Sequence, residues 1–124
     1  MNNDRELLEL AAKSAGIEIV GLVDKMICQP DHRTGGFIVR NDRGGDSCWN
    51  PITDDGDALR LAVKLVLDIE FVWDDVPEEA AIACVRVTAI GGEACVFEEL
   101  GFDPSASTRR AIVRAAAEIG REME

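Results

Sequence analysis

A chain of 124 residues is long enough for one hydrophobic core but too short for two, so we expect a single domain over residues 1–124. Apolar residues make up 47% of the chain and charged residues 30%, a balance typical of globular proteins that argues against intrinsic disorder. The formal net charge of −11 argues against direct binding to nucleic-acid phosphates and favours a basic protein partner, although acidity can also serve solubility alone.

The N-terminal part of the chain predicts one helix and three strands. Apolar residues recur at helical spacing over 4–15, and the β-branched run at 17–23 predicts a strand covered on both faces. Residues 28–36 contain turn formers without periodicity and predict an exposed loop. The segments 37–40 and 46–49 flank five residues rich in Asn, Asp and Gly, which predicts an antiparallel hairpin.

A second helix is predicted after this hairpin. Pro51 ends the second arm of the hairpin, and either Thr53 or Asp54 can cap a helix that runs to about Leu67. The polar positions of this helix fall on one narrow stripe: Asp57, Arg60, Lys64 and Asp68. Because apolar residues cover the rest of its surface, we expect a helix buried on most sides, either within the chain or in a symmetric homo-oligomer.

The C-terminal half begins with three predicted strands. Residues 69–73 alternate between polar and apolar, and segments 80–90 and 94–100 form the clearest hairpin because a Gly-Gly pair between them accepts the positive φ of a type I′ turn. We expect these two strands to form the centre of the sheet. Arg86 then lies either on a partly open face or in a pair, for example with Glu98 across the hairpin.

A third helix is predicted at the C-terminal end, where Asp103 before Pro104 has the pattern of a cap followed by a first-turn proline. Apolar side chains line one face of this helix: Ile112, Val113, Ala116, Ile119 and Met123. The order helix, strands, helix, strands, helix predicts an α+β fold, with a mainly antiparallel β-sheet and three helices packed on it.

The cysteines are not spaced as metal ligands. The chain contains four cysteines and one histidine: Cys28, Cys48, Cys84, Cys95 and His32. No C-x-x-C pair occurs among them, so we expect reduced, mostly buried thiols, no metal and no cofactor. No secretory pattern opens the chain, and its apolar runs are shorter than the roughly 20 residues that span a bilayer. We therefore expect a cytoplasmic protein without membrane contact.

Two stretches of the chain resemble a known family. Residues 49–65 begin with Trp-Asn-Pro-Ile-Thr-Asp-Asp-Gly-Asp, and residues 103–120 contain Asp-Pro and then Ser-Thr-Arg-Arg-Ala-Ile-Val-Arg. These stretches resemble the phage alpha-beta-alpha (ABA) sandwich family of phage and prophage proteins, whereas residues 20–48 and 70–100 match it only loosely. The resemblance implies a compact helix-sheet-helix domain encoded by a phage or prophage. It implies no catalytic residues.

The densest polar group of the sequence lies where the first hairpin ends and the second helix begins. Its members are Trp49, Asn50, Asp54, Asp55 and Asp57, with Arg60 one turn further along the helix. This group either binds a ligand or partner, or its acids simply cap the helix and compensate its dipole. The three aspartates lack the ligand schedule of an EF-hand, so we expect no metal there. Trp49 is expected at the edge of the core.

Arginines of the third helix are the other candidate site residues. Arg109 lies beside the apolar face, where it either pairs with a carboxylate or recognises an anionic ligand. Arg110, Arg114 and Arg121 lie on the opposite face, as a solvated surface or as an anion-facing strip. His32 has no nucleophile or orienting acid near it in the sequence, so we expect no catalytic residues.

These observations favour a non-enzymatic phage or prophage accessory protein that binds a host or phage protein in the host cytoplasm. Countering host antiviral defence is one form that such a role could take. The alternative is a protein that binds or sequesters a small anionic molecule, such as a nucleotide signal, between the start of the second helix and the arginines of the third.

Overall fold

In the computed structural model the described residues are 3–22, 37–40, 45–73, 83–92 and 94–123. They contain three α-helices: α1 (Asn3–Ala15), α2 (Asp55–Leu65) and α3 (Pro104–Glu122). They also contain six strands and a 3₁₀ turn: β1 (Ile19–Leu22), β2 (Phe37–Arg40), β3 (Asp46–Trp49), β4 (Asp68–Trp73), β5 (Ala83–Thr88), β6 (Cys95–Glu99) and η1 (Ile90–Gly92). The predicted α+β fold with three helices is confirmed.

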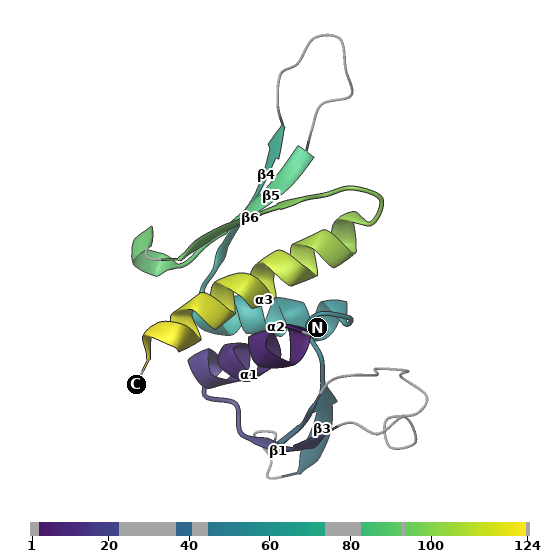
Figure 1. The fold of residues 1–124 in the computed structure, drawn as a ribbon, viewed down its shortest axis with the longest axis vertical. Coiled ribbons are helices and arrows are strands. Elements are labelled where there is room, and N and C mark those ends of the chain that lie inside the picture. The colour runs from purple at the N-terminus through teal and green to yellow at the C-terminus, as the bar shows by residue number, and fades with distance from the viewer. Residues whose placement is uncertain (1–2, 23–36, 41–44, 74–82, 93, 124) are drawn as a thin grey trace.

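The six strands form two antiparallel sheets, with the helices between them (Figure 1). The first sheet has the order β1-β2-β3 and the second sheet the order β4-β5-β6. The sequence pattern predicts one sheet, whereas the structure has two. The strands divide because α2 separates two sets of them along the chain, and each strand pairs only with its neighbours in sequence. The layers are therefore sheet, helices, sheet in the described part of the chain, which differs from the helix-sheet-helix order that the family resemblance implies.

Both predicted hairpins are present. β2 and β3 pair in the expected register, from Phe37 opposite Trp49 to Arg40 opposite Asp46. In the second hairpin, Gly91 has the positive φ that a type I′ turn requires, at 88°. The connection between the two strands is nevertheless longer than the two-residue turn that the Gly-Gly pair predicts. β5 lies at the centre of the second sheet, whereas β6 lies at its edge and not at the centre as expected.

The ends of the helices follow from short-range hydrogen bonds. Asp54 caps α2, since its carboxylate accepts the backbone N–H of Asp57, and Asp103 caps α3 in the same way. α2 ends at Leu65, earlier than predicted, because Val66 adopts a left-handed conformation with a φ of 54°. This conformation reverses the chain into β4 and is unfavourable for a β-branched residue.

A single cluster of buried side chains joins both sheets to the three helices. Its large members are Leu8, Phe37, Trp49, Leu61, Val85, Val87, Ile112 and Val113. Alanines fill the space between the helices, which lets the backbones approach closely. The predicted placement of Trp49 at the core is confirmed, with 6% of its surface exposed.

The contact between α1 and α3 is the closest in the molecule's helical layer. The two helices run in the same direction, since Asp4 pairs with Arg110 near their N-termini and Lys13 bonds to the Met123 carbonyl near their C-termini. Gly120 is buried in this seam, and a Cβ built on it would lie 2.1 Å from the carbonyl oxygen of Leu10. Only glycine fits there without moving a helix.

α2 is not buried on most of its surface within the chain, so that predicted alternative is wrong, and coverage of the helix in a symmetric homo-oligomer stays a prediction. Leu59, Val63 and Val66 have exposed fractions of 59%, 67% and 60%, whereas the polar side chain of Asp57 is only 3% exposed. Apolar residues alone do not determine burial, because a helix face is buried only where another element covers it. β1 is likewise not covered on both faces, since Val20 is exposed.

The cysteines differ from the expectation of four reduced, mostly buried thiols. Cys48 is disulfide-bonded, so that expectation is wrong for it. Cys84 and Cys95 are free, with Cys84 half-buried and Cys95 exposed. The predicted loop at 28–36, which includes His32, lies outside the described residues.

Among the described helices, none combines the length and the apolar character that crossing a membrane requires.

Candidate functional site

Four of the predicted site residues form one hydrogen-bonded group at the start of α2, which we call the cap cluster: Asn50, Asp54, Asp57 and Arg60. The backbone N–H of Asn50 donates to Asp57 Oδ2 at 2.9 Å, and Arg60 donates to Asp57 Oδ1 at 2.7 Å. The backbone N–H of Asp57 in turn donates to Asp54 Oδ2 at 2.8 Å. The group therefore holds the turn between β3 and α2 through its own contacts, as the capping alternative predicts.

Asp55 and Arg109 form a second, separate pair. The guanidinium of Arg109 donates from Nη1 to Asp55 Oδ1 at 2.6 Å and from Nε to the carbonyl oxygen of Ile52 at 2.7 Å. Only 17% of the Arg109 side chain is exposed, compared with 77% for Asp55. Arg109 thus joins α3 to the start of α2 through an ion pair and a backbone carbonyl, which is the carboxylate-pairing alternative.

The other arginines of α3 also lie against carboxylates. Arg110, which the sequence predicts as a site residue, donates to Asp4 at 2.7 Å. Arg114 pairs with Glu98, and Arg121 pairs with Glu118. The strip along this face is therefore balanced by acids, and its role as an anion-facing surface stays a prediction. On the second sheet, Arg86 pairs with Glu70 of β4, and Glu98 pairs with α3 instead.

The structure does not gather the eight predicted site residues into one place. It joins the four residues of the cap cluster, places Asp55 with Arg109, leaves Arg110 with Asp4, and puts Trp49 in the core. The three aspartates at the start of α2 turn to different partners, and no group of three metal-binding side chains occurs in the described residues.

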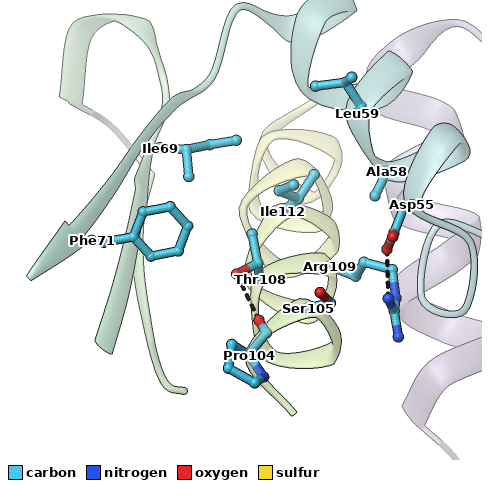
Figure 2. A pocket seen from close by; sticks show the side chains of 10 residues that line it. All are labelled: Asp55, Ala58, Leu59, Ile69, Phe71, Pro104, Ser105, Thr108, Arg109 and Ile112. Carbon is cyan, nitrogen blue, oxygen red and sulfur yellow. Dashed lines mark hydrogen bonds and ion pairs between the residues drawn. The ribbon is translucent and has the colours of Figure 1, made fainter. Parts of the chain in front are cut away.

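A groove between α2 and β4 was not identified from the sequence. Figure 2 shows Ile69 and Phe71 of β4 facing Ala58 and Leu59 of α2, with α3 as the floor between them. The space has a volume of about 380 Å³. We call it the α2–β4 groove and define it by six lining residues: Ala58, Leu59, Ile69, Phe71, Thr108 and Ile112. The Asp55–Arg109 pair lies at its α2 side.

The groove continues into an exposed apolar stripe on α2. Leu59 and Val63 are spaced i and i+4, so they lie along one line of the helix surface, and the exposed Val66 directly follows the end of α2. Each is more than half exposed, as is Phe71 on the opposite wall at 51%. The sequence carried a signal for this surface, because α2 is apolar on two faces and one face suffices for packing against α1 and α3.

Comparison of the chain with protein families, with curated proteins and with solved structures found no match. The resemblance of residues 49–65 and 103–120 to the phage ABA sandwich family therefore stays a prediction.

Proposed function

We propose that this chain is a non-enzymatic protein that binds another protein through the α2–β4 groove and the stripe beside it. One observation carries the proposal: a highly charged chain leaves Leu59 and Phe71 exposed on the two walls of one groove, with the exposed Val63 one turn further along α2. Single exposed apolar residues are ordinary, but a contiguous apolar patch with polar surroundings is typical of a protein-binding surface. Burial of such side chains is the main favourable contribution to association.

The arginines and aspartates give less support to the alternative of an anionic ligand. The N-terminus of α2, where an anion would be attracted, already holds the carboxylate of Asp54. Arg109 is engaged by Asp55 and by the Ile52 carbonyl, so an anion would have to displace both. The groove is apolar, and most of the polar side chains beside it already have hydrogen-bond or ion-pair partners. Such a groove suits an apolar protein segment better than a nucleotide.

The biological setting remains part of the proposal. The resemblance to phage proteins supports a phage or prophage accessory role that is directed at a host or phage protein, and the proposal includes action against host defence. The net charge of −11 supports a basic partner. We also propose that the protein acts in the host cytoplasm, although disulfides such as that of Cys48 are rare in reducing compartments.

Thiol labelling tests the proposed location. The chain is extracted from producing cells, denatured without reductant and treated with an alkylating reagent, and the labelled cysteines are counted by mass spectrometry. Four labelled cysteines would support a reducing compartment, because the chain contains four. Two labelled cysteines, the number that one retained disulfide leaves, would contradict the cytoplasmic location.

Paired phenylalanine variants test the groove. Phe71 and Phe97 are exposed to similar extents, 51% and 54%, and lie on opposite edge strands of the same sheet, but only Phe71 lines the groove. We expect Phe71→Ser to weaken partner binding by about tenfold or more and Phe97→Ser to change it by less than about twofold. The measurement is capture from lysate with identification of the bound protein, followed by titration calorimetry with that protein purified.

The chain's fold provides the control for this experiment. Both phenylalanines are exposed, so neither substitution is expected to lower the free energy of unfolding by more than about 0.5 kcal/mol. Equal binding by Phe71→Ser and wild type to the purified partner would contradict the groove as its binding site. Hydrolysis or group transfer by the purified chain on the captured partner would contradict the non-enzymatic role.

A further inference from the structure

The backbone of β4 offers a second feature beside the groove. β4 is the edge strand of the second sheet and pairs with β5 on one side only. No strand of the described residues pairs with its other edge, so backbone N–H and C=O groups point outward along it. An edge of this kind is a template for another strand.

The width of the sheet explains why α2 is left uncovered. α3 packs beneath β5 and β6, and α2 packs beside α3 on the side of β4 (Figure 2). Helices pack about 8–10 Å apart and strands about 4.8 Å apart, so two helices need about four strands to cover them. The second sheet has three. A fourth strand on the free edge of β4 would extend the sheet across the α2–β4 groove toward Leu59 of α2.

The side chains of β4 indicate what kind of strand would fit against its free edge. Ile69 and Phe71 lie opposite Val87 and Val85 on the face that borders the groove. Asp68 and Glu70 alternate with them and lie on the other face, where both are exposed and Glu70 is paired with Arg86 of β5. A neighbouring strand would therefore meet apolar residues on one face and, on the other, Asp68 beside an ion pair, on a chain with a net charge of −11, so its complement alternates apolar and basic residues.

We infer that the partner segment is an extended strand with alternating apolar and basic residues, which adds to the free edge of β4. Its apolar side chains enter the α2–β4 groove, and its basic side chains lie beside Asp68 and Glu70. Backbone hydrogen bonds to β4 supply pairing, and the alternation supplies specificity. This inference rests on the proposed protein-binding function and names the kind of segment bound.

A second copy of the chain fits this edge poorly. Antiparallel pairing of two β4 strands would bring Asp68 and Glu70 close to the same acids of the other copy, on two molecules that each carry a net charge of −11. Like charges across neighbouring strands are unfavourable. Asp68 and the net charge of the chain attract a basic strand, so charge favours a different protein over a second copy.

Four synthetic peptides test the inference with the full chain. The first is an octapeptide of alternating valine and lysine, and the second has the same composition in two blocks. The third and fourth are alternating peptides in which the backbone nitrogens of either all valines or all lysines are methylated. In an extended strand, alternate residues direct their N–H groups to the same edge, so only one methylated set faces β4. Affinities are measured by fluorescence anisotropy at physiological salt.

We expect the alternating peptide to bind at least about tenfold more tightly than the block peptide. One methylated peptide should lose about tenfold or more in affinity, and the other should stay within about twofold of the unmodified peptide. Phe71→Ser should weaken the alternating peptide, whereas Phe97→Ser should not. Together these results would support strand addition at β4.

Other outcomes overturn the inference. Equal binding of the alternating and block peptides would indicate attraction by charge alone, and equal effects of the two methylated sets would indicate a helix or another non-strand conformation. No binding of the alternating peptide would also overturn it. If Phe71→Ser nevertheless abolished capture of a partner protein, the groove would stand as the binding site and only the strand would be rejected. Sedimentation showing a dimer that Phe71→Ser dissociates would make a second copy the occupant.

Discussion

The α1–α3 seam and the α2–β4 groove show two ways in which the same kinds of apolar residue can be used. In the seam, small residues let two helices approach until the backbone at Gly120 nearly contacts Leu10. In the groove, Leu59 and Phe71 face each other across open space. The seam is complete within the chain, whereas the groove has two walls and no cover. The difference indicates that the seam serves stability and that the groove is available for binding.

The largest difference is expected between two leucines of α2. Leu61 is buried in the closed core with 2% of its surface exposed, and Leu59 lies on the open side with 59% exposed. Leu61→Ala should lower the free energy of unfolding by about 2–5 kcal/mol, because it leaves a cavity. Leu59→Ala should change it by less than about 0.5 kcal/mol. Urea denaturation followed by circular dichroism measures both; comparable losses would show that the groove is closed in solution.

Glycine substitutions sharpen the comparison on the closed side. Gly120→Ala should lower the free energy of unfolding by about 3 kcal/mol, because the new Cβ would meet backbone atoms of α1 at Leu10. Gly56→Ala is the matched control, since its Cβ would meet side-chain atoms of Arg60 and Asp54 at 3.2 Å. We expect this control to change stability by less than about 1 kcal/mol. Thermal and urea unfolding would contradict the close seam if both variants behaved alike.

The closed side and the groove side of α2 can also be compared through one aspartate on each. Asp57 is buried, and removing its carboxylate leaves the Asn50 N–H without that acceptor, so Asp57→Ala should cost about 1–3 kcal/mol. Asp55→Ala should cost less than about 1 kcal/mol, because Asp55 is largely exposed and Arg109 keeps its bond to the Ile52 carbonyl. Equal costs in urea titrations would argue against the cap cluster as a structural unit.

The smallest effect is expected at Val66, on the open side. Val66 is a β-branched residue in a left-handed conformation and is 60% exposed, so Val66→Gly should raise the free energy of unfolding by about 0.5–1 kcal/mol. Val63→Gly, within the last turn of α2, should lower it by about 0.5 kcal/mol, because glycine has a lower helix propensity than valine. If the stripe binds a partner, Val66→Gly should weaken that binding while it stabilises the chain. A stabilised variant with unchanged binding would remove Val66 from the contact surface.

Much of the secondary structure was accessible from the sequence because its signals are local. The cap of α3 at Asp103 and the pairing of β2 with β3 depend on residues within a few positions of each other, whereas for α2 the sequence left Thr53 and Asp54 open and the structure selects Asp54. The position of the C-terminus of α2 was missed because Val66 takes a conformation that glycine usually supplies. That choice depends on where β4 must begin and not on local preference.

The candidate site shows the opposite balance. The sequence singled out the polar residues around Asp57, and the structure joins them through mutual bonds as a structural group, with Asp57 buried and not on a solvated stripe. The groove combines residues of α2, β4 and α3 that are separated by up to tens of positions. The periodicity of α2 indicates more apolar surface than one packing face needs, but it does not indicate which elements cover each face.

The sequence by itself determined the composition of this protein's elements: three helices, their caps, the hairpins and an α+β class. Tertiary structure alone decided that the strands divide into two sheets, that Arg109 pairs with Asp55, and that one apolar face of α2 stays open beside β4. The reason is physical. Helix and strand formation depend on nearby residues, whereas coverage of a face depends on how many strands and helices compete for the same area.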